Sequence, residues 1–341
     1  MTTTPPSPDR IRQMMSGFWV SRTLFSGVEL GLFNELARGR ASAEVLAYRL
    51  KLNPRALERL MNALVSLGLM QKQGNRFANT PESQAYLVEG SPEFVGAQVE
   101  HLANLHWRLW QHLSDAVREN SPRVKQVFGP GFDIFQAMYA DPQRLRAFVQ
   151  GMHTLTMPAA EELVEAVDLS PYHTLMDVGG GSGALCIAAA RRYANLNGIV
   201  FEQPAVCPIA ADFVKRHGMS GRVRVVPGDF FNGESLPREA DAIVLGWVLH
   251  DWPPAQAREV LRNCYQALRS GGVLLLCEKL LDEDKTGPEL TTLMDLHLLV
   301  STGGEEHSAS EYRTWMEAMG FQDISVKVLG ANRDLVLGHK R

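Results

Sequence analysis

The segment DVGGGSG, residues 177–183, places four glycines directly after a short apolar run. Glycine lets the backbone turn sharply and lets a ligand approach it closely, and the first backbone amides of a helix supply positive potential. This pattern indicates a nucleotide or nucleoside site, with a tight structural turn as the alternative. No lysine follows the glycines, which excludes a phosphate-binding P-loop.

Carboxylates accompany these glycines at positions where a nucleoside could contact them. Asp177 precedes the turn and suits a cationic amino group, and Glu202 ends the next apolar run, where it can bind ribose hydroxyls. Asp229 followed by Phe230 suits an exocyclic amine and an adenine face. The segment GGGSGA also satisfies the G-x-G-x-x-A pattern of nicotinamide enzymes. The Asp229-Phe230 pair and Asp177 favour S-adenosylmethionine, because this ligand carries both adenine and a free amine.

His250 lies in the segment VLHDW, residues 248–252, directly after another apolar run. An unperturbed imidazole has a pKa of about 6.5 and can exchange a proton near neutral pH. A single loop histidine is more often structural than catalytic. Beside a nucleoside site, the catalytic interpretation is favoured.

Alternating apolar runs and helical stretches must position these residues from about residue 172 onward. The predicted strands are 174–178, 198–202, 222–226, 241–246, 272–277 and 334–338, and the predicted helices include 183–194, 204–217, 255–269 and 310–319. The alternation predicts an α/β fold, with a parallel sheet covered on both faces. Ligands of such sheets bind beyond the carboxyl ends of the strands.

The chain before this region is helical in pattern from about residue 11 to 165, including continuous helices over 93–119 and 132–167. One apolar stripe repeats every four positions and is predicted to be buried. Its members are Val20, Leu24, Val28, Leu32 and Leu36.

Residues 42–80 predict two helices followed by a hairpin around Gly74-Asn75, which is a winged-helix pattern. Such a unit could bind DNA or could serve packing and dimerisation. Residues 1–100 hold 11 basic and 9 acidic residues, a balance of +2. DNA affinity needs clustered phosphate contacts, so the dimerisation interpretation is favoured.

Composition excludes several classes of protein. The 341 residues are 45% hydrophobic and 21% charged, with a net charge of −4, which is typical of a globular protein and does not indicate a nucleic-acid partner. No apolar run approaches the roughly 18 residues of a membrane span, and no secretory signal is visible. The four cysteines indicate reduced core thiols. These observations predict a cytoplasmic protein with no membrane partner.

In order and spacing, DVGGGSG, GDFF, VLHDW, EKLLDED and GGEEHS resemble the caffeic-acid type O-methyltransferases of plants. The resemblance is closer to the acetylserotonin O-methyltransferase branch and its bacterial natural-product relatives, and it covers nearly the whole chain. It implies a winged-helix-like, helical dimerisation domain (1–100), pocket helices (101–165) and a Rossmann-like S-adenosylmethionine-binding domain (166–341). It also implies a homodimer whose N-terminal helices help line the partner's pocket.

The implied reaction is metal-independent methyl transfer from S-adenosylmethionine to a hydroxyl of a small aromatic substrate, in secondary metabolism. In this resemblance His250 is the general base, flanked by Glu278 and Glu306. The expected cofactor-binding residues are Asp177, Gly179, Gly181, Glu202, Gly228, Asp229, Phe230 and Trp247.

Substrate contacts are expected from Met157, Asp251, Met294 and His297, with further pocket walls from Phe135, Met138, Met152 and Leu293. Trp247 stands where many relatives have Lys or Arg facing the cofactor carboxylate, and His307-Ser308 replaces the usual Arg-Thr. The alternatives are methylation of nitrogen or carbon, another reaction with the bound cofactor, or a winged-helix regulator that senses a ligand.

Overall fold

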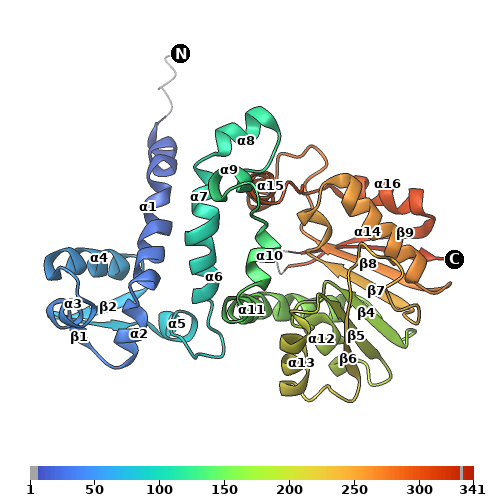
Figure 1. The fold of residues 1–341 in the computed structure, drawn as a ribbon, viewed down its shortest axis with the longest axis horizontal. Helices are drawn as coiled ribbons and strands as arrows, with labels where there is room; N and C mark the ends of the chain where they lie inside the picture. Colours follow the sequence, from blue (N-terminus) through green and yellow to red (C-terminus); the bar gives the residue numbers. More distant parts are fainter. Residues whose placement is uncertain (1–6, 331–332) are drawn as a thin grey trace, which may run out of the picture. The chain divides into compact units, whose positions relative to one another are not determined.

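The computed structural model describes residues 7–330 and 333–341. The chain forms two compact units that divide between Leu105 and His106 (Figure 1). Among the described residues, every helix is too short or too polar to cross a bilayer.

The first unit is helical with a small three-stranded sheet in the order β1-β3-β2. Its elements are α1 (Asp9–Glu29), α2 (Leu32–Ala37), β1 (Ala41–Ser42), α3 (Ala43–Leu50), α4 (Pro54–Ser66), β2 (Met70–Gln73), β3 (Arg76–Asn79), α5 (Pro81–Tyr86) and α6 (Gly96–His101). The side chains of Ser42 and Asn53 cap α3 and α4, as their residue types favour. The two helices and the hairpin occur in the predicted order.

The apolar stripe of this unit is buried only in its second half, so the prediction for its first half was wrong. Gly31 adopts a φ of 68° and separates α1 from α2, in which Leu32 and Leu36 are buried. On α1, Val20 is 54% exposed. Other large apolar side chains of α1 are exposed as well, namely Ile11, Met14, Met15, Phe18 and Trp19.

The second unit begins with short helices that precede a long one. The division between the units falls within a π-helix (Leu102–His106). It is followed by α7 (Trp107–Trp110), α8 (Leu113–Glu119), α9 (Val124–Phe128), α10 (Ile134–Tyr139) and α11 (Pro142–Ala166). The continuous helices predicted over 93–119 and 132–167 are therefore interrupted. In the second case Asp141 caps a new helix before Pro142, because proline favours the first helical position.

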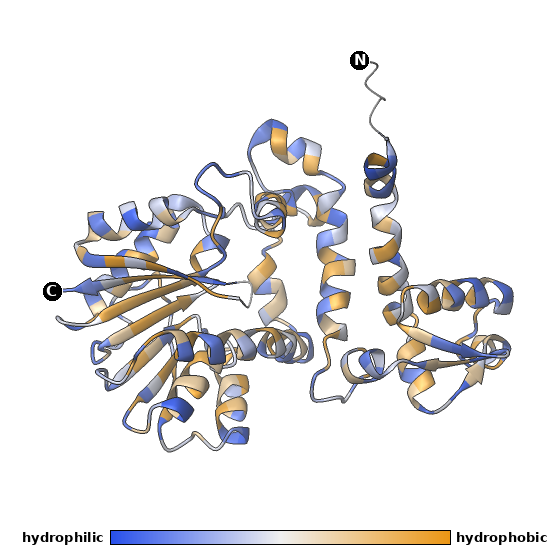
Figure 2. Cartoon of the chain, turned by 180° about the vertical axis from the view of Figure 1, so that it is seen from behind, coloured by the Kyte–Doolittle hydropathy of each residue, from blue (hydrophilic) through white to orange (hydrophobic). Residues whose placement is uncertain are grey.

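A seven-stranded sheet forms the centre of this unit, in the order β6-β5-β4-β7-β8-β10-β9. The strands are β4 (Thr174–Val178), β5 (Asn197–Glu202), β6 (Val223–Pro227), β7 (Ala242–Gly246), β8 (Val273–Glu278), β9 (Phe321–Val328) and β10 (Asp334–Lys340). The helices are α12 (Ala184–Arg192), α13 (Cys207–Arg216), α14 (Pro254–Ala267), α15 (Glu289–Ser301) and α16 (Ala309–Met319), with a 3-10 turn (Leu249–Asp251). The strands are mostly hydrophobic (Figure 2), as expected for a sheet buried on both faces.

The predicted α/β class is confirmed, with two departures in the sheet. Pairing is parallel from β6 to β8, but β10 is antiparallel to both β8 and β9. The link between β9 and β10 is too short for the crossover that parallel neighbours require. Strand β9 was not predicted from the sequence, because this edge strand is largely exposed and has no continuous apolar run.

Candidate active site

A cavity of about 500 Å³ opens at the carboxyl ends of β4, β5, β6 and β7. The sheet side supplies the glycine turn and the residues that follow each strand, and α10 and α11 supply an apolar side. The apolar and aromatic lining residues include Phe135, Met138, Phe148, Met152, Phe230, Phe231, Trp247 and Trp252. The predicted wall residues Phe135, Met138 and Met152 lie here.

The glycine turn joins β4 to α12 with its backbone facing the cavity. Gly179 and Gly181 have φ values of 72° and 55°, conformations that strain other residues. A Cβ at Gly179 would lie 2.9 Å from Val248, whereas one at Gly181 would meet no atom within 4 Å. Gly181 therefore leaves open space in which a ligand can reach the main chain.

Two buried carboxylates border this turn. The Gly181 amide donates a hydrogen bond to Glu202 Oε2 at 2.8 Å, and the Gln203 amide donates to Oε1 at 2.7 Å. Burial raises the pKa of Asp177 to about 7, with a further rise from Glu202 and an opposing effect of Arg333. Burial also raises the pKa of Glu202, although its two backbone hydrogen bonds oppose the rise.

Asp229 and Phe230 line the cavity after β6. Asp229 Oδ1 accepts a hydrogen bond from the Phe231 amide at 2.9 Å, which fixes the turn. Gly228 does not itself line the cavity; a Cβ there would lie 2.3 Å from the Phe201 ring. Gly228 therefore allows the backbone after β6 to pass close to the Phe201 ring.

Trp247 follows β7 with a φ of 56°, and its indole Nε1 is buried without a hydrogen-bond partner among the described residues. The Arg333 guanidinium lies 4.5 Å from the centre of the Trp247 ring and also lines the cavity. Arg333 was not predicted from the sequence, because it lies between Asn332 and Asp334 in no recognisable motif.

His250 lies in the 3-10 turn directly after this segment and has an 8% exposed side chain. Its Nδ1 is 2.9 Å from Glu306 Oε1 and 3.9 Å from Glu278 Oε2. Its Nε2 has no hydrogen-bond partner among the described residues, and Asp251 Oδ1 lies 4.0 Å away. Asp251 lines the cavity, whereas His250 is next to its wall. The structure thus brings the three predicted catalytic residues together.

Electrostatics in this cluster favour a charged imidazole. Burial alone would lower the pKa of His250, but Glu278, Glu306 and Asp251 outweigh it and raise the pKa to about 10. Burial raises the pKa of Glu278 to about 7. Glu278 Oε1 also accepts the amides of Val248 and Leu249 at 3.1 and 3.0 Å. This carboxylate therefore holds the backbone that carries His250.

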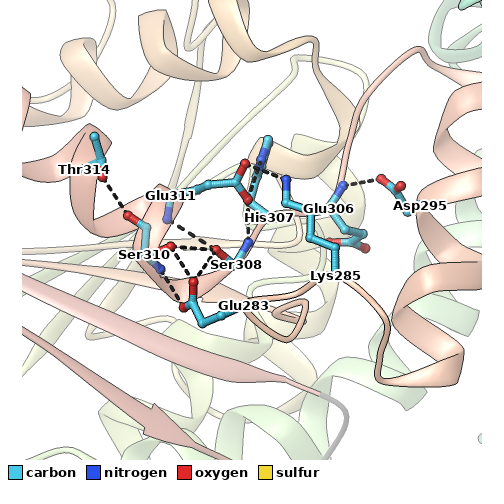
Figure 3. A network of polar contacts seen from close by, with 9 residues as sticks. All are labelled: Glu283, Lys285, Asp295, Glu306, His307, Ser308, Ser310, Glu311 and Thr314. Carbon is cyan, nitrogen blue, oxygen red and sulfur yellow. Dashed lines mark hydrogen bonds and ion pairs between the residues drawn. The ribbon is translucent and has the colours of Figure 1, made fainter.

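A polar network fixes the backbone around Glu306 (Figure 3). The Glu306 amide donates to Asp295 Oδ1 at 2.8 Å. Ser308 and Glu311 form a reciprocal capping box at the start of α16. His307, between Glu306 and Ser308, is buried, and burial lowers its pKa to about 4. His307-Ser308 thus leaves Glu306 firmly placed.

Three expected substrate residues do not line this cavity. Met157 packs against the helix and strand cores next to α12, and Met294 and His297 lie on α15. His297 Nδ1 accepts a hydrogen bond from Trp110 Nε1 at 3.1 Å, and its ring lies 4.0 Å from that of His106. Leu293, an expected wall residue, is exposed.

Comparison with known proteins places this geometry in context. An O-methyltransferase domain matches residues 110–322, and an O-methyltransferase dimerisation domain matches residues 12–89. The chain belongs to the O-methyltransferase family. Two relatives from Streptomyces, each 36% identical, are the 3-hydroxy-5-methyl-1-naphthoate 3-O-methyltransferase of S. sahachiroi (94% of this chain, 92% of the relative) and the N,N-dimethyltransferase OxyT of S. rimosus (94% of both).

The structure of human N-acetylserotonin methyltransferase in complex with SAM matches this O-methyltransferase with a TM-score of 0.86 and 32% identity, over 100% of this chain and 99% of that one. The predictions of an S-adenosylmethionine-dependent O-methyltransferase and of a helical dimerisation domain before an α/β domain are thereby confirmed.

Proposed function

We propose that this O-methyltransferase methylates a hydroxyl of a small aromatic compound, with His250 as general base, in a biosynthetic pathway of secondary metabolism. The observation that carries the proposal is the buried hydrogen bond between His250 Nδ1 and Glu306. It sets the tautomer of the ring and leaves Nε2 available for a proton from the acceptor.

The residues around the cavity fit S-adenosylmethionine. Gly181 offers open space against its backbone, and Glu202 and Asp229 follow neighbouring strands as hydrogen-bond acceptors for a nucleoside. We assign cofactor contacts to Asp177, Gly179 and Phe230 as well, and an indirect role to Gly228. When bound, S-adenosylmethionine supplies an electrophilic methyl group on its sulfonium.

His250 then removes the hydroxyl proton as the acceptor oxygen attacks. A phenol has a pKa of about 10 and is a weak nucleophile at neutral pH. The base form of His250, which becomes populated as the pH approaches its pKa of about 10, takes the proton at Nε2. The resulting imidazolium is stabilised by Glu278 and Glu306, the same groups that raise this pKa. General-base catalysis contributes roughly 10²–10⁴-fold, and alignment of the reactants supplies much of the remainder.

The aromatic wall of the cavity supports an aromatic acceptor. Phe135 stacks on Trp252 with ring centres 5.4 Å apart, and Phe231 packs edge-on against the same indole at 4.8 Å. Such surfaces bind planar rings through apolar burial and offset stacking. The methylated substrate of the S. sahachiroi relative, a hydroxynaphthoate, is of this class.

A mass-spectrometric screen with an isotope-labelled methyl donor tests this function. The panel contains phenols, catechols and hydroxyindoles, each paired with its amino analogue. We expect hydroxyl compounds to gain one labelled methyl group while the amino analogues stay unchanged. Methylation of the amino partners alone would overturn the assignment of oxygen and support the chemistry named for OxyT.

We also propose that the enzyme is a homodimer held in part by α1. The apolar side chains on this helix include Met15 and Trp19, which are 72% and 64% exposed. Exposed apolar patches of this kind mark interaction surfaces. The dimerisation-domain match over residues 12–89 includes both positions.

A further inference from the structure

Arg333 is buried at the cavity and lies directly before β10. Only 3% of the residue is exposed to solvent. Among the described residues that line the cavity it is the only basic one. The acidic lining residues are Asp133, Asp177, Glu202, Asp229 and Asp251.

The guanidinium of Arg333 is only partly satisfied by the protein. Nη2 donates to Thr156 Oγ1 at 3.3 Å, and the group lies over the Trp247 ring. Nη1 is buried with no hydrogen-bond acceptor among the described residues. A Cβ built on Gly246 would lie 3.3 Å from Nη1. The glycine at the end of β7 therefore leaves space for the guanidinium. A buried cation without an anionic partner is costly, which indicates that a ligand supplies the anion.

Asp177 provides the opposite charge at the same end of the cavity. It is 2% exposed, and the charge of Arg333 acts on it, yet no ion pair within 4.0 Å joins the two in the described structure. A separated carboxylate and guanidinium fit a ligand that carries ammonium and carboxylate on one carbon. The methionyl end of S-adenosylmethionine is such a group.

We propose that Arg333 binds the α-carboxylate of S-adenosylmethionine while Asp177 faces its α-ammonium. Arg333 thereby selects cofactors that carry an intact amino-acid end. A carboxylate could also come from an acidic acceptor, but the position of Arg333 beside Asp177, Gly246 and Trp247 favours the cofactor. The inference rests on the cofactor of the family and not on the choice of acceptor.

Isothermal titration calorimetry with two ligands tests the assignment without any turnover. S-adenosylhomocysteine carries the amino-acid end, and 5′-methylthioadenosine lacks it. Arg333→Met removes the charge at similar volume and should weaken S-adenosylhomocysteine binding about 10- to 100-fold, the worth of a charged hydrogen bond. Binding of 5′-methylthioadenosine should change by less than about threefold. Arg341→Met removes an exposed guanidinium just after the same strand and should change neither affinity.

Three results would overturn the proposal. The first is unchanged S-adenosylhomocysteine binding by Arg333→Met, which would leave the residue to an acidic acceptor. The second is an equal loss of affinity for S-adenosylhomocysteine and 5′-methylthioadenosine, which would indicate a distorted cavity. The third is an Arg333→Lys variant that binds S-adenosylhomocysteine no better than Arg333→Met does.

The unaltered enzyme provides a test that does not depend on a variant folding. Decarboxylated S-adenosylmethionine keeps the sulfonium and the amine but would leave Arg333 buried and unpaired. We expect it to bind at least about 10-fold more weakly than S-adenosylmethionine. Equal affinity for the two compounds would contradict carboxylate recognition.

Discussion

At the scale of single residues, the site depends on two buried carboxylates that act on one imidazole. Glu278 holds two backbone amides through Oε1 while its Oε2 acts on His250. Glu306, which follows His250 by 56 residues in the sequence, orients the same imidazole through Nδ1. One negative charge therefore positions the main chain and the other positions the ring, and both strengthen the base.

Removal of the imidazole should separate chemistry from binding. We expect His250→Ala to lower the rate of methyl transfer by roughly 10²–10⁴-fold, because the substitution removes the group proposed to take the hydroxyl proton. The affinity for S-adenosylhomocysteine should stay within about twofold, since His250 is assigned a contact with the acceptor hydroxyl and none with the cofactor. Single-turnover kinetics and calorimetry measure the two effects. His173→Ala, at an exposed histidine, is the control and should leave both quantities unchanged. A methyl-transfer rate that is unimpaired in His250→Ala would contradict the general-base role of His250.

The pH dependence of the reaction should follow the raised pKa of His250. The neutral base forms as the pH approaches about 10, so activity should rise from neutral to alkaline pH. Glu306→Gln keeps an acceptor for Nδ1 but removes a charge, so the rise should move to lower pH. NMR titration of the imidazole, with Glu305→Gln as the control, checks this without substrate. An unchanged His250 pKa in Glu306→Gln would contradict the electrostatic argument.

The same titration has a consequence for folding. The pKa of His250 in the folded protein lies above the unfolded value of about 6.5. Protonation of this residue therefore stabilises the fold fully below about pH 6.5, and the contribution is lost as the pH rises through about 10.

At the scale of elements, the beginning of α16 connects helix stability to the site. The Ser308 amide donates to Glu311 Oε2 at 2.9 Å, and Ser308 Oγ contacts Glu283 Oε2 at 3.1 Å. Glu306 precedes this cap by only two residues. A firmly capped helix therefore limits the motion of the carboxylate that orients His250 (Figure 3).

Loss of the cap should cost measurable stability. We expect Ser308→Ala to lower the free energy of unfolding by about 1 kcal/mol and to slow methyl transfer through looser placement of Glu306. Urea denaturation measures the first effect. Thr314→Ala, on the same helix and with only a bond to the Ser310 carbonyl, should change stability by less than about 0.5 kcal/mol. An equal decrease in the free energy of unfolding of both variants would show that the cap does not stabilise the fold more than an ordinary side-chain hydrogen bond.

Much of the site's sheet side could be predicted because its signals are local. The glycine turn after β4 and the acidic residues after β5 and β6 each follow a strand directly, and parallel strands bring those ends to one edge. Glu278 and Glu306 could be assigned to His250 only through the family resemblance, because no periodicity joins positions so far apart. Arg333 has no motif, and its burial depends on how β10 inserts between β8 and β9.

At the scale of the whole molecule, the dimerisation unit leaves a large apolar surface on α1. The residue spacing predicted burial along a stripe that continues into α2, but within a single chain only its members Leu32 and Leu36 on α2 are buried. Burial of side chains such as Met15 and Trp19 contributes about 25 cal/mol per Å² of apolar surface removed from water. A second copy of the chain would provide that cover.

Charged residues introduced on this surface of α1 should therefore dissociate the proposed dimer into monomers. We expect the double variant Met15→Glu/Trp19→Glu to run as a monomer in light scattering at concentrations where the unaltered chain is a dimer. Tyr48→Glu places the same charge on another exposed side chain of the unit (89% exposed) and should leave the dimer intact. A double variant that remains dimeric would exclude α1 from the interface.

The insertion of β10 between β8 and β9 also constrains biosynthesis. The sheet cannot be completed until residues 334–340 have left the ribosome, because β10 is the only strand with which β9 pairs in the described part of the chain. After β8 has been synthesised, the nascent chain consequently presents an unfinished sheet edge until β10 emerges, a state prone to aggregation. Loss of residues 334–340 would remove the strand between β8 and β9 and with it the strand partner of β9, so such products should be substrates for proteolysis rather than partly active enzymes.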